Sequence, residues 1–183
     1  PNCYGFINSL DGIALWPDVH GCEPVPSGVA IITQSGNIGL NITMQSIGLP
    51  IAYMFTLGNQ TNTNIADIIH AMLDDNRVNA IGLHIEGISD IKSFDVAARR
   101  ALDKKIPIVA IKSGRTDASA KIALSHTSSM TGLDQLFNVF FERLGIARVD
   151  TVPEFLETLK LLSISGAIDH NGVASMSCSG GEA

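Results

Sequence analysis

Short apolar segments that alternate with amphipathic segments are the feature of this sequence that most restricts its fold. The strand-like runs, rich in aliphatic and β-branched residues, occupy 28–33, 51–58, 79–87, 107–114 and 147–150. Segments with helical spacing follow them, at 36–48, 65–75, 94–105, 133–145 and 153–164, and a further helix is expected at 117–123. Because parallel strands need crossover connections, this order predicts a parallel sheet with helices on both faces.

The segments divide the chain into three parts. Residues 28–165 are predicted to form a flavodoxin-like domain, a doubly wound five-stranded parallel sheet in a three-layer α/β/α arrangement. Residues 1–27 contain many helix and strand breakers, such as "GCEPVPSG", and are expected to be an irregular lead-in. The stretch "GVASMSCSGGEA" near the end repeats the plan of "GVAIITQSGNIG" at 28–39, so residues 166–183 are expected to begin a second similar domain.

Composition excludes several classes of function. With 45% apolar and 16% charged residues, the chain can bury a core and does not resemble a disordered protein. A net charge of −6 without a basic patch argues against nucleic acid as a partner. No apolar run approaches the roughly 18 residues of a membrane span, and the first residues are not expected to be a signal peptide. The scattered cysteines Cys3, Cys22 and Cys178 indicate free thiols in a reducing cytoplasm, and no metal site is predicted.

Polar residues follow the apolar strands, where ligands bind to open parallel sheets. "TQSGN" ends the strand at 28–33 and opens a helix, so Ser35 can cap the helix and Gly36 can bring backbone N–H groups close to a phosphate. An ordinary capped turn has the same sequence pattern. Lys112 lies near the end of the strand at 107–114 and Arg115 directly follows it, and both are either anion ligands or solvated loop charges.

Glu86 and His126 are the candidate catalytic pair. Glu86 ends an apolar strand and can accept a hydrogen bond from a histidine ring, which fixes the tautomer and raises the nucleophilicity of the ring. His126 lies between hydroxyl residues in "LSHTSS". Taken alone, Glu86 is equally compatible with an exposed carboxylate at a strand end, and His126 is more typical of a surface loop histidine. His84 is interpreted as a packing residue.

Six stretches together resemble one family, the nucleoside-diphosphate-forming acyl-CoA synthetases, which are relatives of the succinyl-CoA synthetase α chain. In chain order they are "PNCYG", "GVAIITQSGNIG", "LGNQTN", "LHIEGI", "PIVAIKSGRT" and "LSHTSSMTG". The resemblance implies an enzyme that interconverts acyl-CoA, phosphate and ADP or GDP with a carboxylic acid, CoA and ATP or GTP. The phosphoryl group passes through a histidine.

The resemblance also implies site residues. His126 matches the phosphorylated histidine and Glu86 its partner carboxylate; the phosphate-binding helix start is matched by Gln34, Ser35, Gly36 and Asn37. Possible substrate-loop residues are Gly58, Asn59, Ser125 and Thr127. Ser128 stands where the family motif usually has Gly, and "TNTN" at 61–64 replaces common acidic residues, so the acyl group can differ from acetate or succinate.

The resemblance further implies partners that these residues do not supply. CoA, the nucleotide and Mg²⁺ would bind in the complete enzyme, and none of them is expected to bind this segment alone. "PNCYG" matches the tail of a CoA-binding Rossmann domain, and the nucleotide site needs an ATP-grasp domain or subunit. A homo- or hetero-oligomer is expected, with the acyl-CoA or carboxylate and phosphate as small-molecule ligands.

Two other functions remain open. One is a non-catalytic ligand-sensing module, as in synthetase-like regions fused to protein acetyltransferases, although His126 favours the enzyme. The other is a flavin or nucleotide carrier of flavodoxin type, which the lack of paired loop aromatics disfavours.

Overall fold

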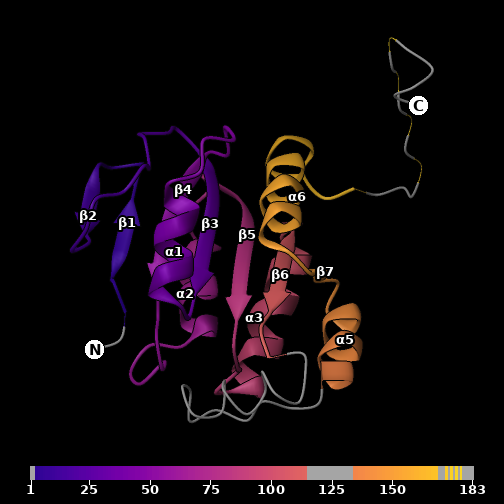
Figure 1. Cartoon of the computed structure of the whole chain (residues 1–183). Coiled ribbons are helices and arrows are strands. Elements are labelled where there is room, and N and C mark those ends of the chain that lie inside the picture. Colours follow the sequence, from indigo (N-terminus) through magenta and orange to yellow (C-terminus); the bar gives the residue numbers. More distant parts are fainter. Residues whose placement is uncertain are drawn as a thin grey trace.

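One mixed sheet organises the computed structural model, which describes residues 3–114 and 134–168 together with residues 172, 174, 176 and 178. Within these residues the strand order is β2-β1-β4-β3-β5-β6-β7 (Figure 1). The strands are β1 (Phe6–Asn8), β2 (Ile13–Leu15), β3 (Gly28–Thr33), β4 (Ile51–Thr56), β5 (Val78–Ile85), β6 (Ile108–Lys112) and β7 (Ala147–Val149). The helices are α1 (Gly36–Thr43), α2 (Ile65–Met72), α3 (Ile91–Asp103), α5 (Asp134–Arg143) and α6 (Val152–Ser165).

The five strands from β3 onward form the predicted parallel sheet. β3 pairs with β4 on one side and with β5 on the other, and β6 and β7 continue outward from β5. The chain therefore starts in the middle of this sheet, steps once to one side and then reverses direction, which is the doubly wound flavodoxin-like order. The predicted fold class is confirmed.

The sheet extends beyond that prediction at its β4 edge. β1 pairs antiparallel with β4, and β2 pairs antiparallel with β1, so part of residues 1–27 belongs to the sheet. The expectation that this whole segment is irregular is wrong. Each of these strands has only three residues, which is too short for a clear period, and all residues of β2 are exposed, so β2 lacks the alternation of buried and exposed residues that marks a strand.

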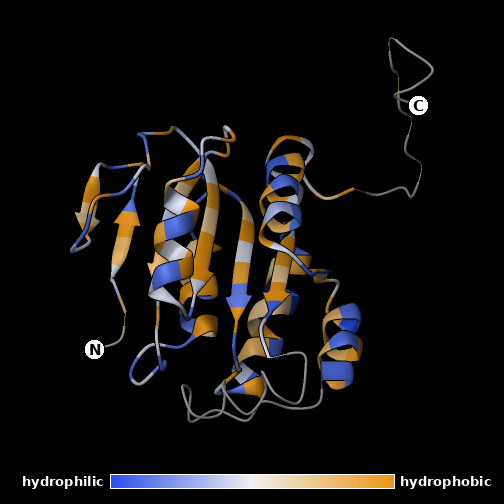
Figure 2. Cartoon of the chain, viewed as in Figure 1, coloured by the Kyte–Doolittle hydropathy of each residue, from blue (hydrophilic) through white to orange (hydrophobic). Residues whose placement is uncertain are grey.

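Helices cover both faces of the parallel strands. α2, α3 and α5 pack on one face in a core that includes Ile32 and Leu83. α1 and α6 pack on the other face over Val29 and Ile31 (Figure 1). Figure 2 shows the consequence in hydropathy, because β3 is apolar along its length while the helices carry both polar and apolar faces. β5 turns hydrophilic at its carboxyl end, which faces the same edge as the carboxyl end of β3.

The helix starts follow local sequence signals. Asn64 and Thr151 cap α2 and α6, and in each helix an acidic residue three positions later completes a capping box. The side chain of Asp90 caps the start of α3. α1 ends at Thr43, before the predicted end at residue 48, since Met44 leaves helical geometry.

Gly82 on β5 sets the approach of α6 to the sheet. A Cβ atom there would lie 2.6 Å from Leu159 Cδ1 and 2.7 Å from Phe155 Cζ, and both side chains are fully buried. We expect Gly82→Ala to lower the free energy of unfolding by about 1–3 kcal/mol, because α6 must shift to make room. Thermal melts measure this, with Gly172→Ala as control, since nothing lies within 4 Å of that position. A melting temperature equal to that of the wild type would contradict this account.

Candidate active site

Buried polar side chains gather at one edge of the sheet. Of the eight buried polar or charged residues of the described chain, six lie at or just after the carboxyl ends of parallel strands: Thr33, Gln34, Thr56, Gln60, His84 and Lys112. Burying polar atoms is unfavourable unless they are hydrogen-bonded, so each of these side chains needs a hydrogen-bond partner. This edge is where the sequence predicted the site.

The predicted phosphate-binding residues lie in one turn between β3 and α1. Ser35 caps α1, and its hydroxyl accepts a hydrogen bond from the Ile38 N–H at 3.4 Å. A Cβ atom at Gly36 would overlap the ring of Tyr4, so glycine is needed for the close packing of these two segments. Asn37 follows on the exposed side of the first turn. The turn leaves unpaired helical N–H groups at its start, which favour an anion.

The packing of Tyr4 brings the "PNCYG" stretch next to the start of α1. The backbone N–H groups of Tyr4 and Gly5 donate to the Thr56 hydroxyl at 2.8 and 2.7 Å, which fastens this segment to the end of β4. The Tyr4 ring also lies against Trp16, with ring centroids 5.2 Å apart. Two of the stretches on which the family resemblance depends are thus neighbours in space.

Gln34 is the most unusual member of the edge. Its side chain is 4% exposed, and its Oε1 accepts hydrogen bonds from the N–H groups of Glu86 and Gly87, the latter at 2.9 Å. Its Nε2 is buried and has no hydrogen-bond partner in the described structure. A buried amide N–H without an acceptor is costly, by about 1–3 kcal/mol, so the atom marks a place where a ligand oxygen would be favourable.

Glu86 follows β5 directly and is half-buried. Its backbone N–H donates to the side chain of Gln34, which connects the Glu86 backbone to the end of β3, just before the predicted phosphate turn. His126, Ser125 and Thr127 lie outside the described residues, as does Arg115. The pairing of Glu86 with His126 therefore stays a prediction.

A row of side chains from three neighbouring strands crosses the edge on the α1 and α6 face. His84 Nδ1 lies 3.0 Å from the Thr33 hydroxyl, and His84 Nε2 lies 2.9 Å from the Ser113 hydroxyl. Thr33 Oγ1 also accepts the Ser35 N–H at 3.0 Å, so the row reaches the capping turn. Both ring nitrogens of His84 are satisfied, as its interpretation as a packing residue requires. The hydroxyl partners are what sequence reasoning missed.

Lys112 lies on the opposite face of the sheet and is only 3% exposed. Its ammonium group donates to the Ser113 carbonyl and lies 4.8 Å from the centre of the Phe137 ring. Burial lowers its pKa, an effect that the nearby carboxylates Asp134 and Glu86 partly oppose. Lys112 is therefore not a solvated loop charge, and its positive charge contributes to the potential at this edge.

The predicted substrate-loop residues Gly58 and Asn59 follow β4. Gly58 has φ of 53°, a left-handed conformation suited to glycine. Asn59 lines a cavity of about 450 Å³ that also contacts Cys3, Phe6 and Phe55, and no charged side chain lines it. Sequence reasoning missed Gln60, whose buried carboxamide contacts the Glu86–Gly87 turn.

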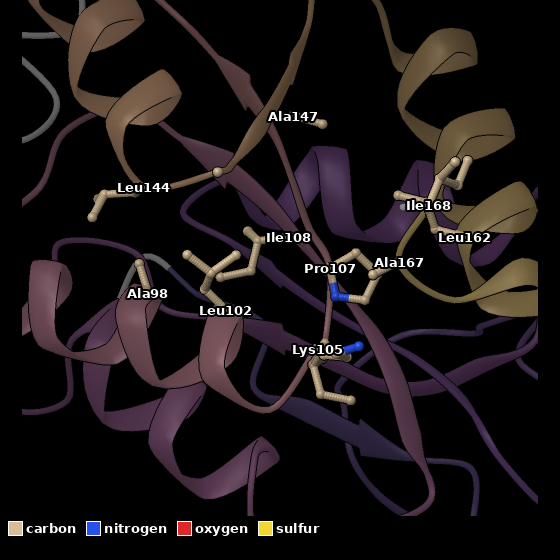
Figure 3. A pocket seen from close by; sticks show the side chains of 12 residues that line it. Ala98, Leu102, Lys105, Pro107, Ile108, Leu144, Ala147, Leu162, Ala167 and Ile168 are labelled. Atoms are coloured by element: carbon tan, nitrogen blue, oxygen red, sulfur yellow. The ribbon is translucent and has the colours of Figure 1, made fainter. Parts of the chain in front are cut away.

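A second cavity, of about 460 Å³, lies at the other edge of the sheet (Figure 3). Figure 3 shows apolar side chains such as Leu102, Ile108 and Leu162 around it, where β6 and β7 begin. Ligands of open parallel sheets bind at the carboxyl edge, and this cavity holds none of the predicted site residues. It is therefore not the candidate active site.

No cluster of three or more His, Cys, Asp or Glu side chains is arranged to hold a metal ion in the described part of the chain. Among the helices in the described ranges, none is long and apolar enough to cross a membrane.

The sheet order and its polar carboxyl edge define a flavodoxin-like ligand-binding domain. The family model for the succinyl-CoA ligase-like flavodoxin domain matches residues 26–162, and the chain belongs to this family. This confirms the resemblance that the sequence motifs indicated.

Relatives with known names support the same assignment. The chain is 33% identical to an ADP-forming acetate–CoA ligase of Methanocaldococcus jannaschii over 99% of its own length and 25% of that protein. It is 32% identical to the α subunit of an ADP-forming acetate–CoA ligase I of Pyrococcus furiosus, with 77% of this chain and 31% of that subunit covered. The chain thus spans only about a quarter to a third of these relatives.

The fold also matches a solved structure. An acetyl-coenzyme A synthetase 1 of Ca. Korarchaeum cryptofilum, in complex with phosphate and ADP, superimposes with a TM-score of 0.76 at 27% identity. The match covers 89% of this chain and 35% of that protein.

The buried imidazole of His84 gives stability a specific pH dependence. Burial and the positive charge of Lys112 lower the His84 pKa from 6.5 to about 4, so the unfolded chain binds a proton between these values and the folded chain does not. We expect the low pKa of His84 to decrease the free energy of unfolding by up to about 3 kcal/mol as the pH falls through this window. Denaturant unfolding of wild type and His84→Gln between about pH 7 and about pH 4.5 should show a shallower decline in the variant. His70→Gln is the matched control, and an equal decline in His84→Gln and wild type would contradict the account.

Proposed function

We propose that this chain is the first flavodoxin-like part of an acyl-CoA synthetase that forms a nucleoside diphosphate. The complete enzyme would interconvert acyl-CoA, phosphate and ADP or GDP with a carboxylic acid, CoA and ATP or GTP. Membership of the succinyl-CoA ligase-like family and the names of the relatives support this reaction. The observation that carries the proposal is the buried, unpartnered Nε2 of Gln34, whose carboxamide contacts the Glu86–Gly87 turn and which lies two residues before α1 in the chain.

His126 is the proposed phosphoryl carrier. A neutral ring nitrogen of His126 would attack the phosphorus of an acyl phosphate, the bond from phosphorus to the carboxylate oxygen would break, and the carboxylate would leave. Glu86 would accept a hydrogen bond from the other ring nitrogen and stabilise the positive charge that develops on the ring. The phosphoryl group would then pass to the nucleoside diphosphate.

The turn at Ser35, Gly36 and Asn37 would hold the phosphoryl oxygens. Its free N–H groups and the Gln34 amide are fixed dipoles, so they need no reorganisation as charge moves onto the oxygens. In this proposal, donors at the end of β3 bind the phosphoryl group, and the carboxylate at the end of β5 stabilises the histidine ring.

The proposal extends to ligands and partners. CoA, the nucleotide and Mg²⁺ would be held by other domains, with residues 1–27 as the tail of a CoA-binding domain and residues 166–183 as the start of a second flavodoxin-like domain. The words "subunit alpha" in the name of the Pyrococcus relative support an oligomer, in which an ATP-grasp domain or subunit would hold the nucleotide. The uncharged cavity beside Asn59 supports an uncharged acyl group. The free thiols of Cys3, Cys22 and Cys178 support a reducing, cytoplasmic location.

Phosphorylation of the complete enzyme tests the proposal. Incubation with γ-³²P-ATP and Mg²⁺ should give a label that is lost in acid, as a phosphohistidine is, and that is absent from His126→Ala. Glu86→Gln should be labelled at least about tenfold more slowly, because the amide keeps the shape but not the charge. His70→Gln is the control and should be labelled like the wild type.

An acid-stable label, or labelling of His126→Ala, would overturn the assignment of the carrier. An unlabelled protein whose melting temperature rises with acyl-CoA would instead favour the ligand-sensing module.

Anion binding can be tested on this chain alone. Phosphate at about five times its dissociation constant should raise the melting temperature by a few degrees over chloride of equal ionic strength, since binding then adds about 1 kcal/mol to stability. Gln34→Glu should abolish the shift, because a carboxylate oxygen replaces the amide N–H and repels the anion. Gln45→Glu makes the same change of charge at an exposed site of the α1 end and should keep the shift. Equal shifts in both variants would contradict the role of Gln34.

A further inference from the structure

Gln60 lies in the loop between β4 and α2 and combines three unusual properties. It is 9% exposed, its φ of 54° is left-handed although it is not glycine, and its carboxamide makes two hydrogen bonds to backbone groups. A left-handed conformation costs about 1–2 kcal/mol for a residue with a Cβ atom, and such residues cluster at functional sites. Other interactions of Gln60 must therefore offset the energetic cost of its left-handed backbone conformation.

The compensation comes from the contacts of the carboxamide. Gln60 Oε1 accepts the N–H of Ile65, the first residue of α2, at 3.1 Å. Gln60 Nε2 donates to the carbonyl of Gly87 at 3.1 Å. The side chain thus joins the loop after β4 to the turn after β5, two segments that are distant in the sequence.

Two glutamines hold the Glu86–Gly87 turn. Gln34, from the end of β3, accepts the N–H groups of both residues, while Gln60, from the loop after β4, donates to the Gly87 carbonyl. The N–H and the C=O of Gly87 are therefore each bound by a buried glutamine. This double hold restricts the backbone of Glu86 relative to the start of α1.

We propose that Gln60 is a positioning residue for Glu86, and this inference rests on the proposed function of that carboxylate. Gln60 makes no contact with the reacting atoms in this proposal. It holds the turn so that the carboxylate meets the histidine ring at the geometry needed for phosphoryl transfer. A displacement of about 1 Å can cost up to about a hundredfold in rate, so the hold has a measurable effect.

Gln60→Glu is the most informative substitution. It keeps the size of the side chain and an oxygen for the Ile65 N–H, but it replaces the donor to Gly87 with an acceptor, so the hold on the turn is lost. Gln60→Gly is the complementary variant, because it removes the side chain and at the same time relieves the left-handed backbone. Gln45→Glu, on the exposed end of α1, is the matched control for the change of charge.

The test is a double-mutant cycle with Glu86→Gln in the complete enzyme, measured as the rate of His126 phosphorylation. Gln60→Glu and Gln60→Gly should each lower kcat by about tenfold or more, with KM for the acyl substrate changed by less than about twofold. In the Glu86→Gln background the same changes should lower the rate by less than about twofold, since Gln60 acts through the carboxylate.

Four outcomes would contradict this inference. Equal effects of Gln60→Glu in both backgrounds would overturn the positioning role, as would a wild-type rate in Gln60→Gly. Loss of stability with an unchanged kcat would also overturn it, because it would leave Gln60 a purely structural residue. A wild-type enzyme without any label on His126 would overturn the proposed function and this inference together, and is thus distinguishable from the other results.

Discussion

Burial of the parallel strands on both faces is the constraint on which the rest of this structure depends. β3 and β5 lie in the middle of the sheet with helices above and below, so the side chains along them are apolar and excluded from water. Crossover helices connect the parallel strands, which brings all carboxyl ends to one edge. Polar groups can be accommodated there, and the buried polar residues of this chain concentrate there. The site is thus a consequence of how the sheet is buried.

The carboxyl edge of the sheet carries many buried polar side chains, and nearly all of the described ones have hydrogen-bond partners. His84 links hydroxyl groups of β3 and the end of β6, and Gln60 and Gln34 share the hydrogen-bonding groups of Gly87. Each hydrogen bond joins segments from different strands, so the edge is held as a unit and its geometry is set before a ligand arrives. Preorganised dipoles of this kind are what phosphoryl transfer requires, because the charge on the transferred group must be stabilised without reorganisation. Among the described side chains of this edge, Gln34 has a buried amide N–H that is left for a ligand, in addition to the backbone N–H groups at the start of α1.

The parts of the site that sequence reasoning found are those with a local signal. Ser35 and Gly36 follow an apolar strand and open a helix, and Glu86 interrupts an apolar run, so both positions could be read from neighbouring residues. Gln60 has no such signal, since its partners Ile65 and Gly87 become visible only when two loops meet. β1 and β2 were missed for a related reason, because β1 joins the sheet by pairing with the distant β4, and β2 joins it only through β1.

The sequence by itself determined the alternation of strands and helices, the fold class and the capping turn at Ser35. These depend on hydrophobic periodicity and on hydrogen bonds between residues close in the chain, which a single sequence displays. Only the tertiary structure decided that Tyr4 packs on Gly36, that His84 connects Thr33 with Ser113, and that two glutamines hold Gly87. These contacts join residues far apart in the chain, and they form because parallel pairing brings the strand ends together at an edge where each buried polar group must find a partner.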